Sequence, residues 1–372
     1  MNILYLTTHL NVGGITSYLL TLAQGFRSRG HNVYVASSGG DSVIRFSQQG
    51  VIHIPIPIRT KSELNILKLG ISAVSLARQL KHRDIDIIHS HTRVTQVLGC
   101  ILQKFIRAPH VTTCHGFFKR RFSRAILPCW GDKVVAISDS VKDHLMFDLG
   151  VQERNIRLVY NGIDVSFFAG AAKIDPEERR SIRKEIGLGG GPVIGIIARL
   201  SDVKGHQYLI RAMKLVLERR PGVQLLIVGE GPMERRLIEL ARTLAVEKSV
   251  FFVPTVVGTA KTLSIIDMYV SPSLNEGLGL SLMEAMAAGV PCVGSDVGGI
   301  RNLIRHGENG ILVKPADPAG LAAAILELLS DPGKARSLAE HASLFINRYF
   351  SQAEMLLRTE EVYRECLKEQ KG

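Results

Sequence analysis

The chain has 372 residues, enough for two or three domains of ordinary size, and 46% of its residues are hydrophobic. Its 46 Lys and Arg residues outnumber its 34 Asp and Glu residues, which gives a formal net charge of +12. No stretch approaches the roughly eighteen consecutive apolar residues of a spanning helix, and no basic segment precedes the strand-like start. We therefore expect a globular protein without a membrane-spanning helix or a cleaved signal peptide.

Short, β-branched apolar runs alternate with longer amphipathic stretches, a pattern typical of parallel strands buried on both faces. In the first half we expect strands over Asn2–Thr8, Asn32–Ser38, Val51–Ile58, Asp86–His91, His110–His115, Lys133–Ser138 and Ile156–Asn161. In the second half we expect strands over Pro192–Leu200, Gln224–Gly229, Val250–Pro254, Met268–Ser273, Pro291–Asp296 and Ile311–Lys314. The two series predict an α/β protein with two tandem Rossmann-like, doubly wound domains.

The stretch between the two series contains Pro176 and three consecutive glycines, which indicates a linker with one short helix. The expected organisation is an N-terminal Rossmann-like domain over 1–165, a linker over 166–190, a C-terminal Rossmann-like domain over 191–350, and a helix over 351–372 packing back toward the first domain. We expect the domains to face each other across a cleft. Ligands then bind at the carboxyl ends of the strands.

The loop after the first strand contains Gly13 and Gly14, and the apolar helix pattern begins at Tyr18. Paired glycines let backbone N–H groups approach an anion at a helix N-terminus. A plain turn is an equally good interpretation of this pair. The full GxGxxG spacing is absent, which argues against NAD binding.

Two cations follow the first strand of the second series. Arg199 comes at the carboxyl end of that strand, and Lys204 lies five residues later, just before the next helix pattern. Both therefore lie on a loop that leads into a helix N-terminus, where they suit a doubly charged phosphate group. The alternative is that they are ordinary surface residues.

Two glutamates follow a later strand of the same series. Glu276 lies in a glycine-flanked loop that ends at Gly279, and Glu284 lies on a short helix that begins near Leu280. The free N–H groups of Leu280 and Ser281 lie between the two carboxylates, so the segment can clamp the hydroxyls and phosphates of a nucleotide sugar. Glu284 needs a partner because it stands on an otherwise apolar helix face.

These motifs together resemble the retaining glycosyltransferases of glycosyltransferase family 4, which have the GT-B fold. The resemblance covers essentially the whole chain in the same order. The motifs that carry it are Glu276-x7-Glu284, Arg199-x4-Lys204, the Gly13-Gly14 loop, Val228-Gly-Glu-Gly-Pro232, Asn161-Gly-Ile-Asp164 and His115-Gly116.

The resemblance implies a role for each site residue. Arg199 and Lys204 would contact the donor diphosphate, Glu284 would hold the ribose, and Glu276 would lie by the transferred sugar. His115 would face the sugar from the first domain, although a buried packing histidine is the alternative, and the glycine loop would close over the phosphates. The catalytic set is thus His115, Glu276, Arg199 and Lys204, and the donor-binding set is Gly13, Gly14, Arg199, Lys204, Glu276, Gly279, Leu280, Ser281 and Glu284. We assign His89 and His91 to packing.

Neither a metal nor another cofactor is expected. Asp84-Ile85-Asp86 has the DxD spacing of metal-binding glycosyltransferases, but it opens an apolar run and therefore lies at the wrong edge of the sheet. Arg199, Lys204 and the helix start at Leu280 would supply the positive charge instead. The expected activity is metal-independent hexosyl transfer from a nucleotide diphosphate sugar, with an epimerase or phosphorylase of the same fold as the alternative.

The excess of positive charge lies in the first half: residues 1–165 hold 20 basic and 10 acidic side chains. The segment Phe117–Arg124 is aromatic and basic, so we expect this half to contact an anionic membrane surface and a glycan or polyprenyl-linked acceptor of lipopolysaccharide or polysaccharide biosynthesis. No nucleic-acid-binding signature accompanies the charge. Five scattered cysteines without a CxxC motif suit a reducing cytoplasm, which predicts a peripheral enzyme on the inner face of the cell membrane. We expect specificity loops around 10–17, 59–70 and 117–125.

Overall fold

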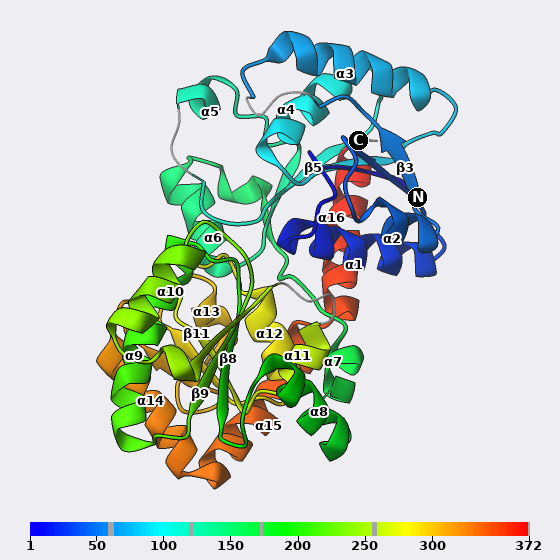
Figure 1. Cartoon of the computed structure of the whole chain (residues 1–372). Coiled ribbons are helices and arrows are strands. Elements are labelled where there is room, and N and C mark those ends of the chain that lie inside the picture. The colour runs from blue at the N-terminus through cyan, green and yellow to red at the C-terminus, as the bar shows by residue number, and fades with distance from the viewer. Residues whose placement is uncertain (59–62, 119–121, 172–173, 255–258, 371–372) are drawn as a thin grey trace. The chain divides into compact units, whose positions relative to one another are not determined.

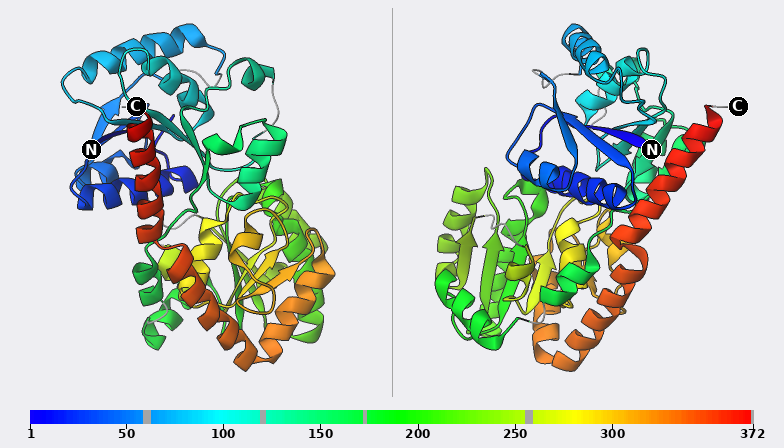
Figure 2. Two further views of the ribbon diagram at one scale, coloured as in Figure 1. Left: turned by 180° about the vertical axis from the view of Figure 1, so that it is seen from behind. Right: turned by 90° about the vertical axis from the view of Figure 1, so that its right-hand side faces the viewer.

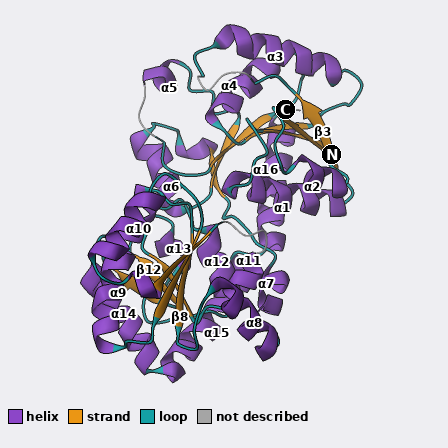
Figure 3. Cartoon of the chain, in the orientation of Figure 1, coloured by secondary structure: helices purple, strands orange, loops and turns teal. Residues whose placement is uncertain are grey.

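In the computed structural model the chain divides into two compact units, each built on one parallel sheet (Figure 1). Unit 1 comprises Met1–Gly162 and Gln352–Gly372, and unit 2 comprises Ile163–Ser351. The structure describes residues 1–58, 63–118, 122–171, 174–254 and 259–370. Helices cover both faces of each sheet (Figure 3), which is the expected α/β class.

The seven-stranded sheet of unit 1 has the order β3-β2-β1-β4-β5-β6-β7, which is that of a doubly wound fold. Its strands are β1 (Asn2–Leu6), β2 (Asn32–Ser37), β3 (Ile52–Pro55), β4 (Ile87–Ser90), β5 (His110–Cys114), β6 (Lys133–Ala136) and β7 (Ile156–Leu158). Its helices are α1 (Gly14–Ser28), α2 (Val43–Gln48), α3 (Ile66–Gln79), α4 (Arg93–Leu102), α5 (Phe122–Ile126), α6 (Asp139–Asp143) and α16 (Gln352–Glu369).

Alternate residues of β1 enter different cores because successive strand side chains point to opposite faces. Ile3 and Tyr5 pack with apolar residues of α1 and α16, whereas Leu4 and Leu6 pack with residues of α3 and α4. Both faces of the strand are buried. The near-continuous apolar runs in the sequence follow from this arrangement.

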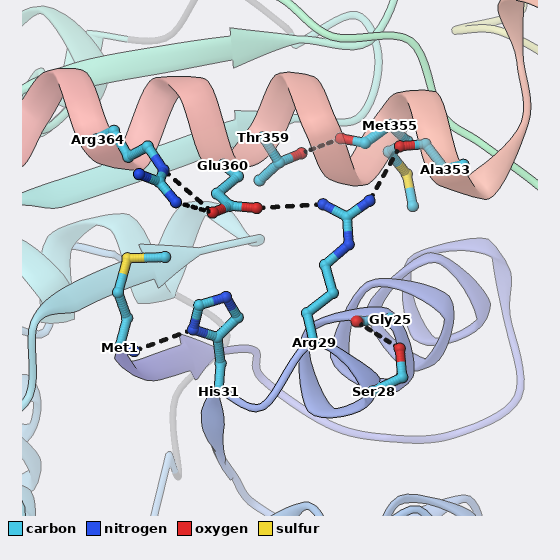
Figure 4. Close-up of polar contacts among 10 residues, drawn as sticks. All are labelled: Met1, Gly25, Ser28, Arg29, His31, Ala353, Met355, Thr359, Glu360 and Arg364. Atoms are coloured by element: carbon cyan, nitrogen blue, oxygen red, sulfur yellow. Dashed lines mark hydrogen bonds and ion pairs between the residues drawn. The ribbon is translucent and has the colours of Figure 1, made fainter.

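Helix α16 is an integral part of unit 1 although unit 2 precedes it in the chain. Figure 2 shows it beside α1, where a Cβ atom on Gly25 would lie 2.2 Å from Leu356 Cδ1. Figure 4 shows the polar edge of this contact: Arg29 donates to Glu360 at 3.2 Å, and Arg364 holds the other oxygen of that carboxylate. The C-terminal helix therefore covers one face of the first sheet.

The six-stranded sheet of unit 2 has the order β10-β9-β8-β11-β12-β13. Its strands are β8 (Val193–Ile197), β9 (Gln224–Val228), β10 (Val250–Val253), β11 (Met268–Ser271), β12 (Cys292–Ser295) and β13 (Ile311–Val313). Its helices are α7 (Val165–Ala171), α8 (Pro176–Ile186), α9 (His206–Arg219), α10 (Glu234–Thr243), α11 (Thr259–Leu263), α12 (Leu280–Ala287), α13 (Ile300–Leu303), α14 (Pro318–Ser330) and α15 (Pro332–Tyr349). Ile194 and Ile196 belong to a core shared with α9 and α14.

Two sequence expectations need correction. The predicted linker over 166–190 holds two helices, α7 and α8, rather than one, and both belong to unit 2. Asp175 accepts the N–H of Glu177 and so caps α8, with Pro176 in its first turn. In addition, the predicted loops around 10–17 and 59–70 already contain the first turns of α1 and α3, and residues 59–62 lie outside the described residues.

Candidate active site

The predicted donor residues of unit 2 lie on two loops that leave adjacent strands. The chain runs from β8 to β9 on one side and returns to β11 on the other side of β8, so a topological switch point lies between β8 and β11. Ligands of doubly wound sheets bind at such points, outside the carboxyl ends of the strands. The Leu274 N–H donates to Val203 O at 2.8 Å and ties the two loops together.

Gly205 makes the close approach of these loops possible. It has φ +70°, and a Cβ atom there would lie 1.9 Å from Pro272 O. Only glycine tolerates both conditions without strain. The position of Lys204, one residue earlier, therefore depends on this glycine.

Lys204 and Glu276 meet directly in the structure. The Lys204 Nζ lies 2.5 Å from Glu276 Oε2, and the Ser273 hydroxyl donates to the same oxygen at 3.3 Å. The sequence predicted that both residues serve one ligand, but their spacing gave no sign of this ion pair. A phosphate that enters the site would meet a lysine already held by a carboxylate.

Arg199 is exposed and forms no ion pair within the described part of the chain. The Val228–Pro232 motif packs against its loop: Leu200 N–H donates to Glu230 O at 2.9 Å, and a Cβ atom on Gly231 would lie 2.3 Å from Leu200 O. The glycine motif thus supports the backbone next to Arg199. Its guanidinium group is available to an anion.

Helix α12 begins beside these cations with unsatisfied backbone donors. Gly279, at φ +101°, is its N-cap, and the first intrahelical hydrogen bond runs from Met283 N–H to Gly279 O. The N–H groups of Leu280 and Ser281 therefore have no intrahelical acceptor, and no acidic side chain lies in the first turn. This helix start can bind an anion.

Glu284 projects from α12 between buried apolar neighbours and has no hydrogen-bond or ion-pair partner among the described residues. Burial raises the pKa of its carboxyl to about 8. The sequence predicted that this carboxylate needs a partner, and the described residues supply none. A donor such as a hydroxyl group would satisfy it.

Unit 1 places its own predicted residues at the carboxyl ends of β1 and β5. Gly13 is the N-cap of α1 and Gly14 is the first residue of the helix, so Gly14 is helical rather than part of an open loop. A Cβ atom on Gly13 would meet nothing within 4 Å. No crowding in the described structure therefore explains a glycine there.

His115 follows β5 and is half-buried. Its Nε2 lies 3.2 Å from His91 Nδ1, and the Tyr18 ring packs against it with ring centroids 4.9 Å apart. Burial lowers the pKa of His115 to about 3, so its ring is neutral at pH 7. Assigning His91 to packing alone was therefore incomplete, because it contacts a predicted site residue. The position of His91 directly after β4, the strand next to β5, could have indicated this contact.

A second buried histidine continues this contact into the interior. His89 Nδ1 lies 2.7 Å from the Tyr363 hydroxyl on α16, and its Nε2 lies 2.7 Å from the Thr113 hydroxyl. The ring centroids of His89 and His91 lie 4.2 Å apart, and the ring planes are tilted by 37°. His89 is thus a fully satisfied core residue, as expected from the sequence.

Asp86 lies at the start of β4, where its carboxylate accepts the N–H of Asn2 at 2.7 Å. The DxD segment is thus at the strand-start edge, opposite to the site loops. In the described ranges, no three His, Cys, Asp or Glu side chains come together as potential metal ligands. The basic residues 119–121 lie outside the described residues. No helix of the described chain is long and apolar enough to cross a membrane.

Two doubly wound sheets, the second with cations and free amides at its switch point, define the architecture of the GT-B glycosyltransferases. Residues 12–167 match the model of Glycosyltransferase Family 4, and residues 178–344 match that of Glycosyl transferases group 1. The chain belongs to this glycosyltransferase family.

Two relatives agree with this assignment, and a solved structure has the same fold. An uncharacterised glycosyltransferase of Methanocaldococcus jannaschii is 31% identical over 95% of this chain and 94% of its own. A phosphatidyl-myo-inositol mannosyltransferase of Mycobacterium tuberculosis is 31% identical over 84% of this chain and 82% of its own. The Anabaena protein HepE, solved with UDP and glucose, superimposes with a TM-score of 0.85 at 23% identity, covering 97% of this chain and 99% of its own.

Proposed function

We propose that the protein is a retaining hexosyltransferase that moves a sugar from a nucleotide diphosphate sugar to an acceptor hydroxyl, without a metal. One observation carries this proposal. At the switch point of unit 2, the loop after β8 carries Arg199 and Lys204, and the loop after β11 carries Glu276 and leads into the free amides of α12. The two loops are hydrogen-bonded to each other. The structure of HepE with UDP-glucose supports a nucleotide sugar as the ligand.

The diphosphate leaving group is the centre of the proposed mechanism. Arg199, Lys204 and the N–H groups of Leu280 and Ser281 would stabilise the negative charge that develops on the departing phosphate. The acceptor hydroxyl would attack the anomeric carbon from the same face, so the configuration is retained. The departing phosphate would accept the proton of the hydroxyl, and no residue of the site is assigned as a covalent nucleophile.

The remaining residues would position the donor. Glu284, which has no partner in the described protein, would accept hydrogen bonds from the ribose hydroxyls, and Glu276 would lie by the transferred sugar. His115 is neutral and would offer a ring nitrogen to the sugar. Gly13 and Gly14, at the start of α1, would approach the phosphates.

The acceptor is proposed to be a glycan or a lipid-linked molecule of the cell envelope, reached at the cytoplasmic face of the membrane. The name of the mycobacterial relative, a phosphatidyl-myo-inositol mannosyltransferase, supports a lipid acceptor. Residues 1–165 hold 20 basic and 10 acidic side chains, and this positive charge supports attraction to an anionic leaflet.

The test begins with a thermal-shift panel of UDP-, GDP- and ADP-sugars, followed by a transfer assay with the sugar that binds. Lys204→Ala should lower turnover about 10²–10³-fold, the loss seen when a donor to a developing oxyanion is removed. Lys214→Ala, which removes an exposed lysine of α9, is the matched control and should leave turnover unchanged. Full activity of Lys204→Ala at sub-saturating donor would refute the assignment.

The products separate this proposal from its alternative. A labelled donor incubated without acceptor should not be converted to an epimer or a sugar phosphate, as an epimerase or phosphorylase would do. The anomeric proton coupling of the transferred sugar reports retention. Activity that survives a chelator is expected, and its loss would show a metal requirement.

A further inference from the structure

Helix α3 carries a row of exposed apolar side chains on its outer face. Leu64, just before the helix, is 58% exposed, Leu67 is 78% exposed and Ile71 is 61% exposed. A spacing of four residues places Leu67 and Ile71 on one side of the helix, and Leu64 lies in the turn before it. The described part of unit 1 thus presents an apolar stripe of exposed side chains. Figures 1 and 2 show α3 at the periphery of this unit.

The opposite face of α3 already fulfils the structural role of the helix. Leu69, Ala73 and Leu76 are buried in the core that α3 shares with α4. A surface helix normally has polar residues opposite its buried face, whereas a helix that is apolar on both faces is normally covered on both. The outer stripe is therefore not required for the fold of unit 1.

Basic side chains flank the stripe. Lys68, Arg78 and Lys81 are exposed, and no acidic residue occurs between Leu64 and Arg83. The nearest preceding acid, Glu63, is buried and accepts the hydroxyl of Ser123 at 2.8 Å. An apolar stripe beside a purely basic rim is complementary to an anionic lipid surface.

We propose that the outer face of α3 docks unit 1 on an anionic lipid bilayer. Leu64, Leu67 and Ile71 insert at the level of the acyl chains, and Lys68 and Arg78 contact lipid phosphates. A second copy of the chain is a poorer occupant, because two such faces would bring their basic rims together. This deepens the membrane association named in the proposed function and rests on it, although docking itself requires neither donor nor turnover.

The test is sedimentation with phosphatidylcholine vesicles that contain phosphatidylglycerol, against vesicles of phosphatidylcholine alone. The double variant Leu67→Ser, Ile71→Ser should bind the anionic vesicles at least about tenfold more weakly, because it removes most of the insertable area. Ile44→Ser on α2, where the side chain is 69% exposed, is the matched control and should bind like the unchanged protein.

A charge variant tests the second part of the proposal. Lys68→Gln with Arg78→Gln should weaken binding to anionic vesicles about fivefold per charge and leave the weak binding to neutral vesicles unchanged. Equal vesicle binding by the apolar double variant and the unchanged protein would overturn the proposal. So would self-association that the double variant abolishes in the absence of lipid, because the stripe would then be an interface between copies.

Donor binding distinguishes this proposal from the proposed function. Both α3 variants should keep the thermal shift that a nucleotide sugar produces, because α3 carries none of the predicted donor residues. If the unchanged protein does not bind vesicles but shows the thermal shift with a nucleotide sugar, docking alone is refuted. If it binds vesicles but shows no thermal shift with any nucleotide sugar, the proposed function alone is refuted.

Discussion

We expect Glu284 to make both the stability of unit 2 and its affinity for the proposed donor depend on pH. Burial raises the pKa of this carboxyl from 4.5 to about 8. The folded state therefore binds a proton more tightly than the unfolded state, and stability falls as the pH rises from about 4.5 to about 8. Each pH unit between these two pKa values corresponds to about 1.4 kcal/mol, so the full loss of unfolding free energy would be about 5 kcal/mol. Because the side chain is only half-buried, solvent screening should reduce the loss to about 2 kcal/mol.

Glu284→Gln removes the ionisable group and leaves a side chain of similar shape. The variant should be about as stable as the unchanged protein near pH 4.5 and about 2 kcal/mol more stable near pH 8.5, measured by denaturant unfolding at both pH values. The unchanged protein should also bind a nucleotide sugar more tightly as the pH rises toward 8, because ribose hydroxyls donate to the ionised carboxylate. The variant should bind weakly at every pH. A stability difference that is the same at both pH values would refute this reasoning.

Two further substitutions test contacts described above. Gly205→Ala should lower the free energy of unfolding by about 2–3 kcal/mol and weaken donor binding, because the new Cβ atom would meet Pro272 O while the backbone keeps a positive φ. Gly307→Ala is the control, at φ +76° with nothing within 4 Å, and should lower it by only about 1 kcal/mol in the same denaturant unfolding assay. His91→Phe should lower turnover about tenfold with little change in donor KM, because the ring of His115 loses its hydrogen-bond partner. If the ring-nitrogen NMR signals of His115 are the same in the variant and the unchanged protein, this reasoning is contradicted.

The strands were predictable because they are parallel and buried on both faces. Each expected apolar run contains one strand of the described sheets, and the differences are at the ends. The run Val51–Ile58 shortens to β3 (Ile52–Pro55), since prolines at 55 and 57 cannot donate to a ladder. The start of α1 at Gly14 was missed because the apolar pattern was counted from Tyr18, although Ile15 already belongs to it.

The sequence predicted which strand ends carry the site residues in each unit, but not which of these residues touch. Residues that follow strands of one parallel sheet lie at the same edge, so Arg199, Lys204 and Glu276 were expected near each other. Their actual contacts depend on the strand order, which the sequence does not state. The placement of β8 beside β11 brings Lys204 to Glu276, and that of β4 beside β5 brings His91 to His115.

The discontinuity of unit 1 has a consequence for synthesis. Its core includes Met355, Tyr363 and other residues of α16, so the ribosome must translate all of unit 2 before the first unit can close. Until then, Phe26 and its neighbours on α1 lack their cover and are exposed to non-native association. Unit 2 is continuous in sequence and can complete its core first. The nascent chain should therefore reach its native state with the later unit folded ahead of the earlier one.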